Sequence, residues 1–173
     1  MDQNTKDIFE EEVTEVEEQE HTFNWKAYII TALSIFVAFC ILNSIFPLCL
    51  VHGTSMSPTI SDGDLLVTCR IIGTVERFDI VNVSLLDGEI IIKRVIGLPG
   101  ETVQIVNGHV YINGEMLDDV VDGITVSKGM AGEPLTLGEG EYFVLGDNRM
   151  ISKDSRTIGA IPYEWIESKV ISK

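Results

Sequence analysis

The longest apolar stretch of the chain lies near its beginning. No charged side chain occurs between Ala27 and Ile60, and residues 27–46 are mostly apolar. About 20 apolar residues in a helix span the hydrocarbon core of a bilayer. Asn24 is suited to cap such a helix, and Pro47 is suited to end it. The pattern therefore predicts a transmembrane helix over residues 24–46.

After Pro47 the pattern changes to short apolar runs separated by glycines and Asn-Gly steps. In residues 101–117, apolar positions alternate on both sides of Asn107-Gly108, and a second Asn-Gly follows at 113–114. Asn-Gly supplies the two positive φ angles of a type I′ turn, so a tight hairpin continuing into another turn is expected. Further strands are predicted at residues 48–53, 64–70, 80–85, 89–96 and 141–145.

The predicted fold is mainly β, with a single N-terminal transmembrane helix followed by an antiparallel sheet or barrel-like domain. No helix longer than a turn is expected in the β-rich half, and residues 118–140 are expected to form a loop or an edge hairpin. We divide the chain into a tail at 1–23, a transmembrane helix at 24–46 and a β-rich domain at 47–173.

The flanks of the apolar stretch favour an uncleaved anchor over a cleaved signal peptide. The stretch is longer than a usual signal-peptide core, its leader is acidic, and no A-x-A site follows it. Lys26 is the only basic residue that flanks the stretch on its N-terminal side, and Arg70 is the first one beyond the stretch. This weak bias favours a cytoplasmic N-terminus and an extracytoplasmic β-rich domain.

Charge and cysteine content exclude several classes of function. The net charge is −15, and residues 1–26 hold nine acidic residues against Lys6 and Lys26. Nucleic-acid binding requires clustered Lys and Arg, so we expect no nucleic-acid partner. Three cysteines without a C-x-x-C pair, and three scattered histidines, indicate neither a disulfide framework nor a metal site. We expect no cofactor.

The stretch "HGTSMSPTI", residues 52–60, offers serines but no suitable histidine. A serine hydroxyl needs a general base to become a nucleophile. His21 is expected on the other side of the membrane, and His109 lies at a hairpin tip. His52 is three positions before Ser55, so strand alternation would send the two side chains to opposite faces. A Ser-His-Asp triad is therefore not expected.

A lysine can replace the histidine if its amine is neutral, which requires an apolar environment or a nearby positive charge. Lys93 in "EIIIKRVIG" follows three isoleucines in a strand apolar enough for a core. Alternation sends Lys93 and Arg94 to opposite faces, so one charge can be buried while the other reaches solvent. The alternative is an edge strand in which Lys93 extends along the surface to water.

The segment "GDNRMISKDSR", residues 146–156, is denser in polar side chains than turn chemistry requires. Two aspartates, two arginines and two serines alternate there, which indicates a side-chain network that fixes a loop beside a site. Its polar members are Asp147, Asn148, Arg149, Ser152, Asp154, Ser155 and Arg156.

Four segments, in order after the anchor, resemble the bacterial type I signal peptidases in their short Gram-positive form. They are "GTSMSPT" (53–59), "GDLLV" (63–67), "KRVIGLPG" (93–100) and "GDNRMISKDSR" (146–156), and the resemblance extends to about residue 160. It implies a membrane-anchored serine endopeptidase that removes N-terminal signal peptides from exported preproteins, with the β fold of that family. The implied partners are those signal peptides and the cell membrane.

The resemblance also implies roles for individual residues. Ser55 matches the nucleophile and Lys93 its general base. Ser152 matches the serine that helps to position the lysine amine, and Met56 is expected beside the pocket for the residue before the cleaved bond. Asp154 and Arg156 match a structural ion pair, and Asp147 shapes the same loop together with Asn148 and Arg149.

Two positions depart from the family pattern. Gly53 stands where longer members have a hydroxyl that donates to the oxyanion, so the backbone N–H of Ser55 and an unidentified donor would serve. Ile151 stands where the fourth segment commonly has asparagine.

Substrate binding is expected beside the strands at 48–53 and 89–93, where an extended peptide could add a strand. Small pockets at alternate positions would accept alanine, with Val51, Ile90 and Ile92 as candidate walls. Two alternatives remain: a catalytically inactive membrane-tethered β module that binds signal peptides, and a sortase-like transpeptidase using Cys69 beside Arg70.

Overall fold

The computed structural model describes residues 24–70, 73–121 and 127–173. The chain divides into two compact units, residues 1–40 and 41–173. The predicted tail at 1–23 lies outside the described residues.

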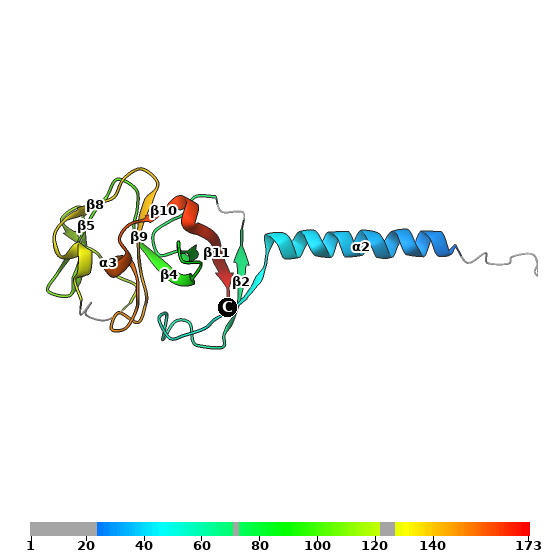
Figure 1. Ribbon diagram of the computed structural model, residues 1–173, viewed down its shortest axis with the longest axis horizontal. Coiled ribbons are helices and arrows are strands. Elements are labelled where there is room, and N and C mark those ends of the chain that lie inside the picture. The colour runs from blue at the N-terminus through cyan, green and yellow to red at the C-terminus, as the bar shows by residue number, and fades with distance from the viewer. Residues whose placement is uncertain (1–23, 71–72, 122–126) are drawn as a thin grey trace, which may run out of the picture. The chain divides into compact units, whose positions relative to one another are not determined.

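The N-terminal helix is present as α2, Trp25–Ile45, drawn in blue in Figure 1. The backbone N–H of Ala27 donates to Asn24 Oδ1 at 3.2 Å, so Asn24 caps the helix as predicted. Apolar side chains are spread around α2 rather than gathered on one face, and its length and composition are sufficient to cross a membrane.

The larger sheet has seven antiparallel strands. In spatial order β1-β2-β11-β3-β4-β9-β10 they are Leu48–Leu50, Leu65–Cys69, Ile166–Ser172, Ile80–Ser84, Ile90–Gly97, Glu141–Leu145 and Ile161–Pro162. The chain's C-terminal strand, β11, therefore lies in the middle of the sheet, between β2 and β3.

The smaller sheet has four antiparallel strands in the order β7-β6-β5-β8. They are Glu115–Met116, His109–Ile112, Thr102–Val106 and Leu135–Thr136. Asn107 and Asn113 have φ angles of 49° and 54°, and the glycine after each is also at positive φ. Both Asn-Gly turns predicted from the sequence are thus present.

Three short helical segments complete the described chain: η1 at Gly129–Gly132, α3 at Ser155–Ile158 and η2 at Tyr163–Trp165. The predicted mainly-β antiparallel class is confirmed. Two expectations for individual elements were wrong. The first strand ends at Leu50 rather than at residue 53, and beyond the strands expected from the sequence the domain also has β10 and β11 near its C-terminal end. Within 118–140, the described residues form η1 and the short strand β8.

Apolar packing holds in place the two parts of the chain that form the candidate site, β4 and the segment after β1. Gly97 at the end of β4 allows the smaller sheet to approach, because a Cβ there would lie 2.6 Å from Val103 Cγ2. A separate core cluster forms under the segment after β1 and consists of Val51, Met56, Ile60 and Leu66. This cluster holds the segment 51–63 against β2.

Candidate active site

Ser55 lies in a turn segment rather than on a strand. After β1 the chain turns back, with Gly63 N donating to Val51 O at 3.0 Å and Gly53 N donating to Asp62 Oδ1 at 2.7 Å. Met56 is 2% exposed and anchors this segment in the core. Ser55, just before it, is only half-buried. The expectation that His52 and Ser55 share one strand was therefore wrong, because the strand has already ended.

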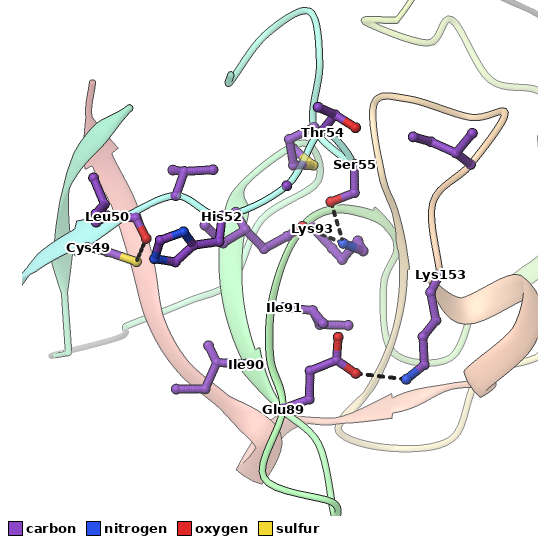
Figure 2. A pocket seen from close by; sticks show the side chains of 15 residues that line it. Cys49, Leu50, His52, Thr54, Ser55, Glu89, Ile90, Ile91, Lys93 and Lys153 are labelled. Atoms are coloured by element: carbon purple, nitrogen blue, oxygen red, sulfur yellow. Dashed lines mark hydrogen bonds and ion pairs between the residues drawn. The ribbon is translucent and has the colours of Figure 1, made fainter. Parts of the chain in front are cut away.

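Lys93 approaches Ser55 from β4. Its side chain is buried, with the residue 2% exposed, and Nζ donates to Ser55 Oγ at 2.9 Å and to Ile92 O at 2.8 Å. Figure 2 shows this contact between the strand and the turn segment. The alternative in which Lys93 extends to solvent was wrong, since the amine is enclosed by the core.

The environment of Lys93 makes the neutral amine more accessible than in a solvent-exposed lysine. Burial lowers the pKa of Lys93 to about 8, because removing the ammonium from water is costly. The carboxylates of Asp154, Glu89 and Asp147 act in the opposite direction, but burial has the larger effect. A substantial fraction of the amine is thus free to accept a proton at mildly alkaline pH.

Arg94, the next residue on β4, is also buried, at 9% exposure. Its Nε and NH2 atoms donate to the two carboxylate oxygens of Asp147 at 2.8 and 2.6 Å, and NH1 donates to Phe78 O at 3.0 Å. The expectation that one of the two adjacent charges reaches solvent was therefore wrong. A bidentate carboxylate compensates the guanidinium inside the protein.

The loop 146–156 is held by a second buried ion pair. Arg156 donates through Nε to Asp154 Oδ1 and through NH2 to Asp154 Oδ2, both at 2.8 Å. Asp154 Oδ2 also accepts from Gly146 N at 3.0 Å, and Arg156 NH1 donates to Arg149 O at 2.6 Å. These bonds close the loop on itself.

The same loop is bound to the segment that carries Ser55. Asn148 N donates to Ser55 O at 2.9 Å, and Asn148 Nδ2 donates to Thr54 O at 3.3 Å. Arg149 is paired with Asp119 at 2.7 Å. The loop therefore positions the backbone of the serine directly.

Ser152 packs at this junction. A Cβ on Gly146 would lie 2.5 Å from Ser55 O and closer still to Ser152 Oγ, so only glycine fits there. Ser152 Oγ is buried and has no hydrogen-bond partner among the described residues. The two hydrogen bonds of the Lys93 amine go to Ser55 and Ile92.

A pocket surrounds the Ser55–Lys93 contact. Its walls include all four candidate substrate-binding residues, Val51, Met56, Ile90 and Ile92. Cys69 is not among its lining residues. The other lining residues are Cys49, Leu50, His52, Gly53, Thr54, Ser55, Glu89, Ile91, Lys93, Ile151 and Lys153.

Glu89 and Lys153 form an exposed ion pair at 2.8 Å that sequence reasoning did not identify (Figure 2). No local pattern could have indicated it, because the two residues are 64 positions apart.

One edge of β4 is open toward this pocket. Leu85 N donates to Glu89 O, and Val95 N donates to Asp79 O. With the β3–β4 register, these bonds determine which alternate residues of β4 form backbone hydrogen bonds with β3. In antiparallel pairing, Ile90 and Ile92 then direct their backbone groups away from β3. Since β9 pairs with β4 only from Arg94 onward, no strand among the described residues covers these groups, and Ile92 O accepts from Lys93 Nζ instead.

Comparison with known proteins gives consistent matches. The family model described as "Signal peptidase, peptidase S26" matches residues 23–172. Signal peptidase I of Bacillus licheniformis is 39% identical over 149 residues, covering 78% of this chain and 77% of that protein. Signal peptidase I V of Bacillus subtilis is 35% identical over 149 residues, covering 78% and 89%. The crystal structure of a signal peptidase I from Enterococcus faecalis has 36% identity and a TM-score of 0.49, covering 58% of this chain and 99% of that one.

Proposed function

Because the chain belongs to the peptidase S26 family of signal peptidases, we propose that it cleaves N-terminal signal peptides from exported preproteins, with Ser55 as nucleophile and Lys93 as general base. The family membership itself confirms the resemblance found in the four sequence segments. The observation that carries the assignment of roles is the 2.9 Å hydrogen bond between Lys93 Nζ and Ser55 Oγ in a buried environment.

The proposed reaction follows from the chemistry of the two groups. The neutral Lys93 amine takes the proton of Ser55 as Oγ attacks the carbonyl carbon of the scissile peptide bond. The ammonium then gives this proton to the leaving amine, so that an ester on Ser55 remains. A water molecule, deprotonated by the same amine, hydrolyses the ester and regenerates the serine.

The backbone N–H of Ser55 is the proposed donor to the oxyanion. It has no acceptor among the described residues, so it is available to stabilise the negative charge that develops on the carbonyl oxygen. Gly53 does not supply the second donor expected from the sequence, because its N–H donates to Asp62 Oδ1.

Substrate binding is proposed to use the open edge of β4. An extended peptide beside Ile90–Ile92 can bond to the outward backbone groups of Ile90 and to the N–H of Ile92, as in the addition of a strand to a sheet, while Ile92 O accepts from Lys93 Nζ. Its side chains would point alternately toward and away from the apolar walls, which include Val51, Met56 and Ile92. This arrangement favours small side chains at the first and third positions before the cleaved bond.

Helix α2 is proposed as the membrane anchor, with residues 1–23 in the cytoplasm and residues 47–173 outside. The weak charge bias around α2 and the family's substrates support this orientation. An anchored enzyme meets a signal peptide that is itself in the membrane, which raises the effective concentration of the substrate.

Cleavage of a purified preprotein with alanine at positions −1 and −3 tests the proposal. We expect that Ser55→Ala and Lys93→Ala abolish cleavage without unfolding the protein, and that Lys93→Arg fails too because a guanidinium cannot deprotonate serine. Ser57→Ala, in the same segment but outside the pocket lining, is the matched control and should retain activity. Cleavage by Ser55→Ala would contradict the proposal, and wild-type binding without cleavage would indicate an inactive binding module.

A further inference from the structure

The carboxylates around Lys93 oppose its proposed role. A negative charge near the amine favours the ammonium form, which cannot accept the Ser55 proton. Three carboxylates act on Lys93 in this way. Each of them is bound to a cation of its own: Asp154 to Arg156, Asp147 to Arg94, and Glu89 to Lys153.

Two of these three pairs lie inside the protein and differ from the third. Asp154 and Asp147 have side chains with no exposure, and their arginines hold the loop 146–156 in place. Neither arginine can be removed without disturbing that loop, so their electrostatic effect on Lys93 is inseparable from their structural one.

The third pair is accessible and lies in the pocket itself. The side chains of Lys153 and Glu89 are 54% and 50% exposed, and both residues line the pocket that contains Ser55 and Lys93 (Figure 2). The hydrogen bond to Glu89 raises the pKa of Lys153. Lys153 therefore keeps its charge throughout the range in which Lys93 titrates.

We propose that Lys153 is a positioning residue for the reaction, which partly offsets the charge of Glu89 and so limits the extent to which this carboxylate favours the ammonium form of Lys93. The inference rests on the proposed function, since it assumes that a neutral amine is the reactive form. Lys153 acts through Glu89 and touches neither Ser55 nor Lys93 in the described contacts.

Other charged groups near Lys93 remain unchanged when Lys153 is replaced. Asp62, in the segment that follows Ser55, accepts a hydrogen bond from Gly53 N. Asp79, directly before β3, is paired with Lys169. His52 lines the opposite wall of the pocket. The remaining groups on the loop and on β4 are Asp147, Arg149, Asp154, Arg156 and Arg94. A change at Lys153 acts mainly at Glu89, to which it is bonded, and also at Asp87, whose carboxylate accepts from Glu89 N and interacts electrostatically with Lys153.

The direct test is a titration of the Lys93 amine in the full-length protein in detergent. Trace acetylation with acetic anhydride across a pH series, read by mass spectrometry of the Lys93 peptide, gives the pKa without using activity. At an ionic strength of about 0.01 M, where screening is weak, we expect Lys153→Met to raise the pKa of Lys93 by roughly 0.3–0.5 unit. Glu89→Gln should lower it, and the double variant should return it toward the wild-type value.

A second readout links the amine to the reaction. The acidic limb of kcat/KM for an uncharged test peptide should shift with the pKa of Lys93 in each variant. The shift should shrink at about 0.5 M salt, where the Debye length is only a few ångströms, whereas a purely structural effect would not respond to salt.

Lys169→Met is the matched control, since it breaks an ion pair with Asp79, which lies outside the pocket lining and is not one of the three carboxylates that raise the pKa of Lys93. It should leave the pKa of Lys93 unchanged. An unchanged pKa in Lys153→Met, or a shift that salt does not reduce, would overturn the inference. If instead Lys93→Ala still cleaves preproteins, the proposed function fails, while the acetylation series still decides whether Lys153 controls the amine.

Discussion

The Lys93 amine bonds to a hydroxyl and a backbone carbonyl rather than to a carboxylate. Its pKa is about 8 in the folded protein, compared with an ordinary value of 10.5. The unfolded chain therefore binds more protons than the folded one between these two values. Stability rises with pH across this window, and below about pH 8 the penalty for the buried ammonium is fully present.

Lys93→Met removes this penalty while filling a similar volume. We expect the variant to raise the free energy of unfolding at pH 7 by about 1–3 kcal/mol, because one pKa unit corresponds to about 1.4 kcal/mol. The gain should diminish as the pH rises toward and beyond 10.5, above which the wild-type amine is neutral in both states. Urea unfolding at pH 7 and pH 10 measures both values, and an equal change at the two pH values would contradict the expectation.

Among the structural elements, the loop 146–156 depends on ion pairs with distant parts of the chain. Arg94 on β4 and Asp147 in the loop are separated by 53 positions, and both are buried. A buried pair contributes little net stability relative to apolar residues, but removal of one partner leaves an uncompensated charge.

We therefore expect Asp147→Ala to destabilise the protein by about 3–5 kcal/mol. The double variant Arg94→Leu/Asp147→Leu should lose less stability than Asp147→Ala alone, because no unpaired guanidinium remains. Chemical unfolding of the wild type, of Arg94→Leu and Asp147→Leu as single variants, and of the double variant provides the comparison. Additive losses would show that the pair is not coupled in this way.

The elements that were predicted correctly are those with local signals. Period-two alternation and Asn-Gly turns identified the β5–β6 hairpin, and apolar runs identified β2, β3, β4 and β9 within one or two residues. In β11, Glu167 and Lys169 interrupt the apolar pattern. This strand is stabilised by pairing with β2 and β3, which lie far away in the sequence, so no local pattern predicts it.

The site was predictable to the level of residue types. No histidine is suitably placed in the sequence to act as the base, and Lys93 lies in an apolar stretch of sequence. These two features indicate a lysine base without the family resemblance. The burial of Arg94 could not be foreseen, because its partner Asp147 is known only once the topology is known. The same holds for Glu89 and Lys153, whose contact is created by the fold.

At the scale of the whole molecule, the two units are proposed to divide the work between membrane attachment and chemistry. The apolar α2 would bring the β-rich domain to the membrane, while the Ser55–Lys93 contact and the contacts of the loop 146–156 with the Ser55 segment all lie within residues 41–173. The chemistry should therefore survive removal of the helix, whereas the encounter with membrane-bound substrates should not.

We expect a chain of residues 47–173 to cleave a soluble peptide at nearly the rate of the full-length protein. Its cleavage of a preprotein inserted in vesicles should fall by about 100-fold or more, because the effective concentration provided by the anchor is lost. Parallel assays on the two substrates measure the ratio. An unchanged rate on the vesicle-bound preprotein would contradict the proposed role of α2.

The central claim is that a neutral Lys93 amine deprotonates Ser55, and the pH dependence of kcat/KM tests it most directly. We expect kcat/KM to rise with pH through an inflection near 8 and to fall about tenfold per unit below it. The profile should be unaltered in His52→Ala. A profile without an inflection near 8, or one whose acidic limb disappears when His52 is replaced, would contradict the assignment of Lys93 as the base.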